Sequence, residues 1–204
     1  MILSLAAQAQ TALDSAVAQY QRGDLAGARA AFTRLSAQGV PAAAYNLAVM
    51  HLRREAQLGS DREALRLMTR AAEAGFVTAM VGLAELHELG GAGLPVDLAL
   101  AVQWQRRAAE AGSVDAQVAL ATAHYLGRGA PKDVATAARW YRIAAQGGDV
   151  GAMYLIASMF EAGDGVERDL AEARYWYAAA ARNGDEAAPG KVKELDARLG
   201  KPAS

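Results

Sequence analysis

The chain has 204 residues, of which 53% are hydrophobic and 21% are charged, and its formal net charge is −1. This length and composition predict a folded protein with a sizeable core and exclude an intrinsically disordered chain. Lys and Arg (21) nearly balance Asp and Glu (22), so no basic surface for nucleic acid or anionic lipid is indicated. The lack of cysteine excludes disulfides, thiolate nucleophiles and cysteine-ligated metals, and no apolar run is long enough to predict a membrane-spanning helix.

Residues 1–10 allow two interpretations. They look like the tail of a secretory signal with an Ala-x-Ala site at Ala7 to Ala9, but they lack a charged start and a full apolar stretch. They also open a pattern typical of a first helix, which we favour. The apolar residues with helical spacing are Leu5, Ala9, Leu13, Ala16, Val17 and Tyr20. The compartment stays open: cytoplasmic is slightly favoured if Met1 is the true start, and periplasmic or secreted if residues 1–9 end a signal peptide.

A short motif that ends in glycine recurs along the chain. Ala71–Gly75 reappears as Ala108–Gly112, Ala144–Gly148 and Ala180–Gly184, and a degenerate copy ends at Gly39. The steps between these closing glycines are 36, 37, 36 and 36 residues. An internal period of this length is typical of solenoids, in which no unit buries its apolar face alone and consecutive units stack into one core.

Other positions keep the same frame and divide each unit into two helices. A first helix, for example residues 114–126, ends in a glycine-containing loop. The second helix is expected to begin after a short polar side chain that caps it and to end at the closing glycine in the left-handed conformation. The predicted caps, fifteen residues before each closing glycine, are Asp24, Ser60, Asp97, Asp133 and Asp169.

This frame predicts one repeat domain over residues 1–204. Its expected parts are an atypical N-terminal helix pair (1–39), repeats over 40–75, 76–112, 113–148 and 149–184, and a capping helix with a tail (185–204). In the capping helix Val192, Leu195 and Leu199 are expected to face the core, with Lys191, Lys193, Glu194, Asp196 and Arg198 on the polar side.

The order of the recurring residue types resembles the Sel1-like repeat, a relative of the tetratricopeptide repeat. The shared elements are Ala-x-x-x-Leu, Gly-x-Gly, Asp, Ala, Trp-Tyr and Ala-Ala-x-x-Gly. The match is best in the last two repeats, carries one extra loop residue over 79–112, and is degraded over 43–75, where Arg54 and Leu67 replace the usual glycine and tryptophan. The resemblance implies an all-α, right-handed α-solenoid of antiparallel helix pairs, with about five repeats of 36 residues, a C-terminal capping helix and a bacterial origin.

Two sets of aromatic or histidine residues occupy single repeat positions. His51, His87 and His124 stand twelve residues past a closing glycine. Neighbouring helices pack about 8–10 Å apart, too far for one metal with bonds near 2 Å, so we expect these histidines to pack and to make local hydrogen bonds. The tryptophans are expected in the core, and the Gly-x-Gly elements in turns. The tryptophans are Trp104, Trp140 and Trp176.

Sequence signatures of enzymes are missing. No Gly-x-Ser-x-Gly, Ser-x-x-Lys, His-Glu-x-x-His or EF-hand loop occurs. The resemblance implies a non-catalytic scaffold or adaptor that binds a protein or peptide, without cofactor or metal, nucleic acid or membrane insertion. The alternatives are an inhibitor or immunity-type regulator of a partner enzyme and, less favoured, a cell-wall-related hydrolase. Partner, pathway and oligomeric state stay open.

The outward face of each first helix is the predicted partner-binding site. In tetratricopeptide-like arrays this face lines a concave groove. Its tyrosines and carboxylates favour a peptide with apolar anchors and some positive charge. An alternative is that some positions, especially Leu89 and Leu126, bury against the following loop. The predicted groove residues are Tyr45, Val49, Arg53, Val81, Glu85, Glu88, Val118, Thr122, Tyr125, Tyr154, Ser158 and Glu161.

Overall fold

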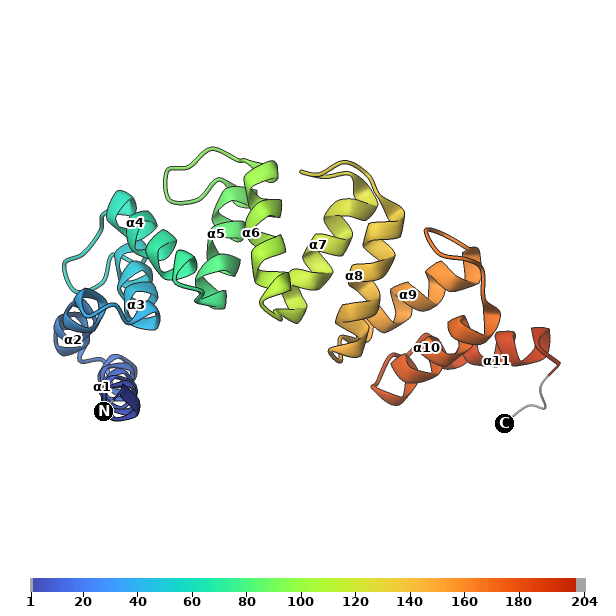
Figure 1. Ribbon diagram of the computed structural model, residues 1–204, viewed down its shortest axis with the longest axis horizontal. Coiled ribbons are helices and arrows are strands. Elements are labelled where there is room, and N and C mark those ends of the chain that lie inside the picture. Colours follow the sequence, from blue (N-terminus) through green and yellow to red (C-terminus); the bar gives the residue numbers. More distant parts are fainter. Residues whose placement is uncertain (1, 201–204) are drawn as a thin grey trace. The chain divides into compact units, whose positions relative to one another are not determined.

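The described part of the chain is all-α, with eleven helices and no strand (Figure 1). The structure is a computed structural model that describes the backbone of residues 2–200 and the side chains of residues 7–200. The helices are α1 (Ile2–Gln21), α2 (Leu25–Ala37), α3 (Pro41–Leu52), α4 (Asp61–Glu73), α5 (Val77–Leu89), α6 (Leu98–Glu110), α7 (Val114–Leu126), α8 (Val134–Gln146), α9 (Val150–Ala162), α10 (Leu170–Arg182) and α11 (Ala188–Arg198).

The helices pack in sequence order within two compact units, which divide inside α6. Unit 1 spans Met1–Trp104 and unit 2 spans Gln105–Ser204. In unit 1 each helix from α1 to α4 contacts the next, and in unit 2 each helix from α7 to α10 does so. These stacked pairs confirm the predicted all-α solenoid, and α7 coincides with the helix expected over residues 114–126.

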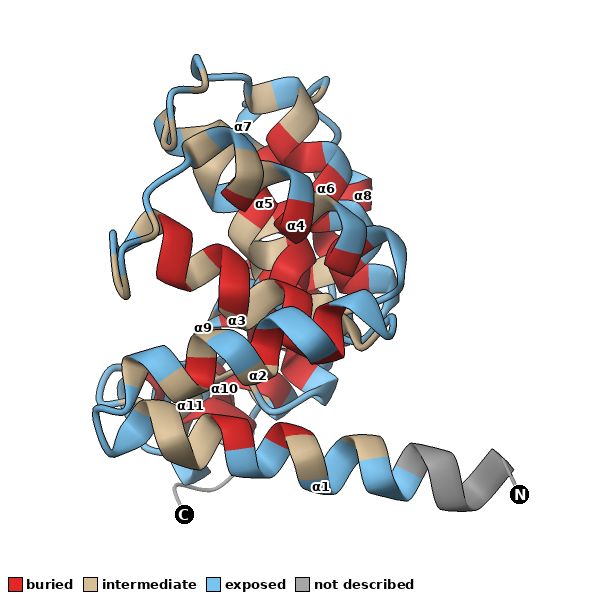
Figure 2. Cartoon of the chain, turned by 90° about the vertical axis from the view of Figure 1, so that its left-hand side faces the viewer, coloured by how far each residue is buried: buried red, intermediate tan, exposed pale blue. Residues whose placement is uncertain are grey.

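The N-terminal residues form a helix, as predicted. Leu13 and Ala16 of α1 are buried, and Ala9, Val17 and Tyr20 are half-buried. Figure 2 shows buried and exposed residues alternating along this helix, which is the pattern of one apolar face packed on a neighbour. The side chain of Leu5 lies outside the described residues.

The predicted caps begin the second helix of each pair. In each case a side-chain oxygen accepts a hydrogen bond from a backbone N–H of the first helical turn, where the amide has no partner within the helix. The donor–acceptor distances are 2.9 Å for Asp24, 3.1 Å for Ser60, 2.9 Å for Asp97, 2.9 Å for Asp133 and 3.0 Å for Asp169. The hydrogen bonds from Thr136 hold the pKa of Asp133 below its ordinary value.

The closing glycines end these helices in the left-handed conformation, as predicted. Their φ angles are +85° at Gly39, +88° at Gly75, +92° at Gly112, and +97° at both Gly148 and Gly184. Residues with a Cβ adopt such angles at a cost, so the glycine column fixes where each helix pair reverses into the next.

Small residues let the helices approach closely. In three alanine pairs both residues are at most 2% exposed: Ala71 and Ala72, Ala108 and Ala109, and Ala144 and Ala145. Trp104 and Trp176 are buried and Trp140 is half-buried, so the tryptophan positions belong to the packing of the second helices, as predicted.

The capping helix α11 differs from prediction at one residue. Leu195 is fully buried, with Val192 and Leu199 half-buried. Asp196, however, is only 4% exposed and pairs with Arg174 of α10, so its assignment to the polar side is wrong. The physical reason is its repeat position, twelve residues past Gly184, which is the inward-facing position of the histidines.

The degraded repeat reaches its turn without the usual glycine. Arg54 adopts a left-handed φ of +57°, followed by Ala56 at +48° and Gln57 at +63°. The Arg54 guanidinium donates to the carbonyl of Gly59 and pairs with Asp61 at 2.9 Å. These contacts close the loop on itself and offset the cost of its backbone conformation.

Candidate functional site

A hollow of about 190 Å³ lies in unit 2 at the ends of two first helices. Side chains from α7, α8, α9 and the loop after α9 line it, and two of them, Tyr125 and Ser158, belong to the predicted groove. Leu155 is 41% exposed, so the lining of the hollow includes an apolar side chain that a ligand can reach. The lining residues are Tyr125, Tyr141, Leu155, Ser158, Met159, Ala162 and Asp164.

Hydrogen bonds fix the polar groups of the hollow. The Tyr125 hydroxyl donates to Asp164 at 3.1 Å, and this bond raises the pKa of Tyr125. The hydroxyls of Thr122 and Tyr141 lie 2.8 Å apart in a second hydrogen bond, while burial raises the pKa of Tyr141. Both phenols are therefore protonated at neutral pH, and the site is largely formed before any ligand arrives.

The loop that carries Asp164 is positioned by its two flanking glycines. Gly163 caps α9 with φ +79°, and Gly165 follows at φ +69°. A Cβ on Gly165 would lie 2.5 Å from the carbonyl oxygen of Val134, the first residue of α8. Only glycine permits this close approach, which holds Asp164 against Tyr125.

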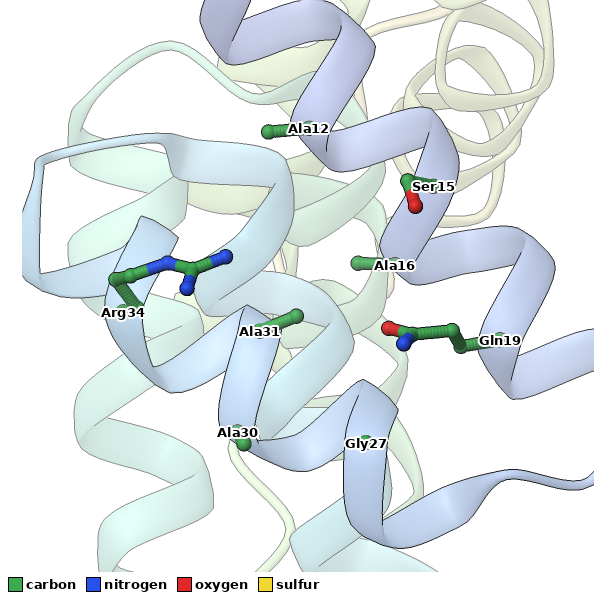
Figure 3. Close-up of a pocket in the computed structure, with 8 residues that line it drawn as sticks. All are labelled: Ala12, Ser15, Ala16, Gln19, Gly27, Ala30, Ala31 and Arg34. Carbon is green, nitrogen blue, oxygen red and sulfur yellow. The ribbon is translucent and has the colours of Figure 1, made fainter.

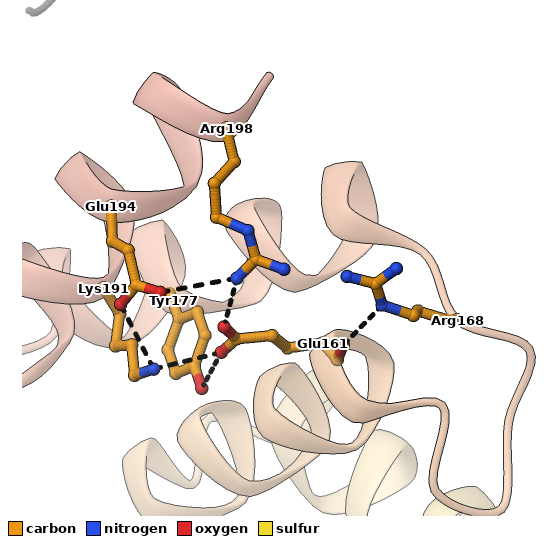
Figure 4. Close-up of polar contacts among 6 residues, drawn as sticks. All are labelled: Glu161, Arg168, Tyr177, Lys191, Glu194 and Arg198. Carbon is orange, nitrogen blue, oxygen red and sulfur yellow. Dashed lines mark hydrogen bonds and ion pairs between the residues drawn. The ribbon is translucent and has the colours of Figure 1, made fainter. Parts of the chain in front are cut away.

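Glu161 anchors the capping helix (Figure 4). Its carboxylate accepts from the Tyr177 hydroxyl at 3.1 Å, from Lys191 Nζ at 3.3 Å and from Arg198 Nη1 at 2.7 Å. Burial alone would raise the pKa of Glu161, but these hydrogen bonds outweigh it and hold the pKa below its ordinary value. Two cations from α11 thus neutralise a carboxylate that the sequence pattern assigned to the groove.

The other predicted residues of unit 2 lie on the same first helices. Tyr154 is half-buried and packs edge-on against Tyr177, with ring centroids 4.9 Å apart. Val118 and Thr122 are half-buried on α7. These residues shape the surface around the hollow, but of the predicted set only Tyr125 and Ser158 line it.

In unit 1 the predicted residues lie along α3 and α5 and just past the end of α3. Tyr45 packs on Phe76, with ring centroids 5.4 Å apart, and lies next to Gly82 of α5. Arg53 is exposed and donates to the Tyr20 hydroxyl at 2.9 Å, which in turn donates to Glu55. Glu85 is exposed, whereas Val49, Val81 and Glu88 are half-buried.

The alternative that Leu89 and Leu126 bury against the following loop is wrong. Leu89 is 78% exposed and Leu126 is 61% exposed. Each is followed by a left-handed glycine, Gly90 or Gly127, which turns the chain away from the leucine. The loop therefore covers the glycine, and the leucine side chain stays in solvent.

A second hollow in unit 1 lies between α1 and α2 (Figure 3). Its volume is about 430 Å³, and it lies outside the predicted groove. Most of its lining is small, so its shape results from missing side-chain volume rather than from a converging set of polar groups. The lining residues are Ala12, Ser15, Ala16, Gln19, Gly27, Ala30, Ala31 and Arg34.

Two of the histidines make local contacts, as predicted. The Nδ1 atom of His51 accepts a hydrogen bond from the Ser60 backbone N–H at 3.3 Å. His124 lies with Nδ1 3.4 Å from the Pro131 carbonyl oxygen and Nε2 3.2 Å from Arg106. Within residues 7–200, no three His, Asp or Glu side chains converge as metal ligands.

We expect His51 to make stability pH-dependent. Burial lowers its pKa from 6.5, partly opposed by Glu63, so the folded state binds protons more weakly than the unfolded chain. This contribution to stability is complete above pH 6.5 and is lost as the pH falls through the lowered pKa. Between about pH 7.5 and pH 5.5, the free energy of unfolding measured with urea should fall less for His51→Gln than for the unsubstituted protein. The Gln amide oxygen can still accept the hydrogen bond from the Ser60 N–H. An equal loss in both proteins would contradict this role.

The stacked helix pairs define the fold class as an α-solenoid. The family model for the Sel1 repeat matches residues 41–76, 77–113, 114–149 and 150–185. The chain therefore belongs to the Sel1 repeat family, whose members are generally protein-interaction scaffolds. Among residues 2–200, none of the helices combines the length and hydrophobicity that crossing a lipid bilayer requires.

Solved structures show the same fold. The chain is similar to c5321, a protective antigen of uropathogenic Escherichia coli strains, with TM-score 0.83 and 23% identity over 96% of this chain and 43% of that one. It is also similar to a Sel1 repeat protein from Oxalobacter formigenes, with TM-score 0.73 and 33% identity over 83% of this chain and 49% of that one. The chain thus spans less than half the length of either protein. A search of curated proteins gave no match.

Proposed function

We propose that this protein is a non-catalytic interaction module whose unit 2 binds a partner protein or peptide at the hollow bounded by Tyr125, Leu155 and Asp164. The observation that carries the proposal is the preformed hollow itself, with an exposed leucine beside two hydrogen-bonded tyrosines. Such rigid aromatic and aliphatic surfaces are typical anchors of protein interfaces.

The size of the hollow favours a peptide side chain over a cofactor or metabolite. Its volume of about 190 Å³ is below the roughly 300–1,000 Å³ of small-molecule sites. One large apolar side chain can occupy it. Asp164 at its edge then favours a neighbouring donor, either a backbone N–H or a basic side chain. The first-helix faces of α3 and α5 in unit 1 remain further candidate contacts.

Site-specific photocrosslinking tests this assignment. A benzophenone amino acid at position 158, in place of Ser158, should trap the partner in a native lysate, because Ser158 lines the hollow. The same group in place of Glu172, an exposed residue on the second helix α10, is the matched control and should not trap it. The crosslink at position 158 should disappear when Leu155→Glu places a charge at the hollow. Trapping from both positions alike would contradict the proposed site.

Removal of two aromatic side chains gives an independent readout. We expect the double variant Tyr125→Ala and Tyr154→Ala to bind the trapped partner at least about tenfold more weakly, since Tyr125 lines the hollow, Tyr154 lies on the surface around it, and aromatic anchors that a partner covers each contribute more than about 1 kcal/mol. Tyr125→Phe keeps the ring and removes only the hydroxyl that holds Asp164, so it should lose less. Isothermal titration with the purified partner measures both, and circular dichroism verifies the fold. Unchanged affinity in a folded double variant would remove the tyrosines from the site.

A further inference from the structure

The hollow of unit 2 has a counterpart one repeat further along the chain. Side chains of α7, α8 and α9 line the hollow, and α9, α10 and α11 take the same places in the counterpart. In α11, Ala188 and Leu195 are buried, as Ala152 and Met159 are at the equivalent positions of α9. The helix α11 therefore packs with the same face and shows which side chains a first helix can place here. Tyr125 and Tyr141 correspond to Glu161 and Tyr177, and Leu155, Ser158 and Ala162 correspond to Lys191, Glu194 and Arg198.

Charged side chains of α11 close the counterpart, as Figure 4 shows. The Tyr177 hydroxyl donates to the Glu161 carboxylate at 3.1 Å. Two cations of α11 donate to the same carboxylate, Arg198 Nη1 at 2.7 Å and Lys191 Nζ at 3.3 Å. The Glu161 side chain is only 16% exposed, so these residues largely cover it. A carboxylate, a tyrosine hydroxyl and a guanidinium thus lie together at this point.

The hollow keeps a carboxylate and two tyrosines but has neither of these cations. Leu155 stands in the place of Lys191, and Ala162 stands in the place of Arg198. The carboxylate comes from Asp164, which lines the hollow and accepts from a tyrosine hydroxyl at 3.1 Å. Within residues 7–200, Asp164 forms no ion pair. The hollow therefore offers space and an acceptor where the counterpart holds a guanidinium.

One cation of this chain lies near the hollow without neutralising its carboxylate. Lys132 Nζ is 6.0 Å from the centroid of the Tyr125 ring, in a cation–π contact. Lys132 is exposed and belongs to the loop after α7. Because this lysine contacts the aromatic ring, the Asp164 carboxylate stays available to a donor from outside the chain.

We propose that the hollow of unit 2 takes an arginine side chain of the partner, with the guanidinium on Asp164 and the methylene stem on Leu155 and Met159. This assignment rests on the proposed function and names the residue that the partner contributes. A purely apolar side chain would cover Asp164 without replacing the water that it loses, which costs free energy. An arginine supplies the apolar contact and the charged donor in one side chain.

Arginine fits the polar groups better than lysine does. A guanidinium is planar and has five N–H donors, so it can donate to the carboxylate and to a neighbouring hydroxyl at once. The Tyr141 hydroxyl also lines the hollow, at the place of Tyr177 in the counterpart. In the counterpart the guanidinium of Arg198 makes the shorter hydrogen bond to Glu161, 2.7 Å against 3.3 Å for the ammonium of Lys191.

Methyl NMR with three short peptides tests the arginine. The probes are blocked alanine peptides with arginine, citrulline or leucine at the centre, since citrulline has nearly the shape of arginine but no charge. We expect the arginine peptide to shift the methyl signals of Leu155 and Met159, with an affinity that falls with added salt. The citrulline and leucine peptides should each bind at least about tenfold more weakly.

Substitutions in and beside the hollow assign the charge. Asp164→Asn keeps an acceptor for Tyr125 but removes the negative charge, so it should weaken the arginine peptide at least about tenfold. Glu167→Gln is the matched control, because Glu167 is an exposed carboxylate of the same loop outside the hollow lining, and it should bind normally. Leu155→Lys gives the hollow the residue of its counterpart, so it should exclude the arginine. Circular dichroism verifies that each variant is folded.

The titrations separate the arginine from the proposed function. Leu155→Glu removes the apolar support of the stem, so its loss of crosslinking from position 158 does not distinguish an arginine from an apolar side chain. No methyl shift with the arginine peptide, equal affinity for arginine and citrulline, or unchanged binding by Asp164→Asn would each overturn the arginine while the crosslink stands. Weaker binding by Lys132→Ala would also overturn it, because the hollow would then take an anion. Failure of the crosslink itself would contradict the proposed function.

Discussion

Gly165→Ala should lower the free energy of unfolding by about 3 kcal/mol. Two costs combine at this residue. Its φ of +69° disfavours any residue with a Cβ, and the added Cβ would lie 2.5 Å from the Val134 carbonyl oxygen and 2.9 Å from the Ala135 nitrogen. Both neighbours are backbone atoms at the start of α8, which cannot move without disturbing the helix. Urea unfolding monitored by circular dichroism measures the loss.

Gly184→Ala is the matched control for this substitution. Gly184 also has a positive φ, +97°, but a Cβ there would meet no atom within 4 Å. The substitution therefore costs only the free energy of placing a residue with a Cβ at a positive φ, about 1–2 kcal/mol. The difference between the two variants isolates the close approach of the Gly165 loop to α8. If both variants lose the same stability, that approach does not constrain the loop.

Gly165→Ala should also weaken partner binding at the hollow of unit 2. A displaced loop moves Asp164 away from Tyr125, whose hydroxyl now donates to it at 3.1 Å. Under conditions where Gly165→Ala is still folded, we therefore expect less photocrosslinking from position 158. Gly184→Ala, which lies outside the hollow lining, should crosslink normally.

Asp196→Ala should destabilise the C-terminal end of the solenoid by about 2–3 kcal/mol. Arg174 donates to Asp196 through Nε and, at 3.0 Å, through Nη2, and the Asp196 side chain is only 5% exposed. Loss of the carboxylate leaves the guanidinium without its partner in a partly buried site. Because the Arg174 side chain is 28% exposed, water offsets part of that cost, which places the value below that for a fully buried pair.

Two further variants test this explanation. Lys193→Ala, on the exposed side of α11, should change stability by less than about 0.5 kcal/mol. The double variant Arg174→Met and Asp196→Leu should recover most of the loss, since apolar side chains can replace a buried ion pair without leaving a lone charge. Hydrogen exchange at α11 amides reports whether the helix detaches. Equal exchange in Asp196→Ala and Lys193→Ala would show that the pair does not hold α11.

The repeat pattern predicted the features that depend on local backbone chemistry. The caps at Ser60 and Asp133 and the left-handed glycines at Gly112 and Gly148 are set by interactions within a few residues of the chain. A short polar side chain before a helix, or glycine after it, has much the same effect in any fold. For this reason the starts and ends of the second helices, and both bounds of α7, could be predicted from spacing alone.

The candidate site was predicted less completely because its contacts join distant parts of the sequence. Tyr125 and Ser158 were placed on the outward face, but the contribution of Tyr141, Leu155 and Asp164 to one hollow depends on how α7, α8 and α9 stack. A helical pattern gives the direction of a side chain relative to its own axis. It does not give the side chain that the neighbouring repeat places opposite.

Charged residues show most clearly what the sequence decides and what the tertiary structure decides. The sequence by itself determined the repeat length, the helix pairs, the caps and the family, since these follow from local hydrogen bonding and periodic burial. Only the tertiary structure decided that Glu161 is neutralised by Lys191 and Arg198, that Asp196 is buried against Arg174, and that Leu89 stays in solvent. The reason is that the environment of a side chain depends on its partners on other helices. In these ion pairs the partners are 22 to 37 residues apart in sequence, and local propensity does not encode such contacts.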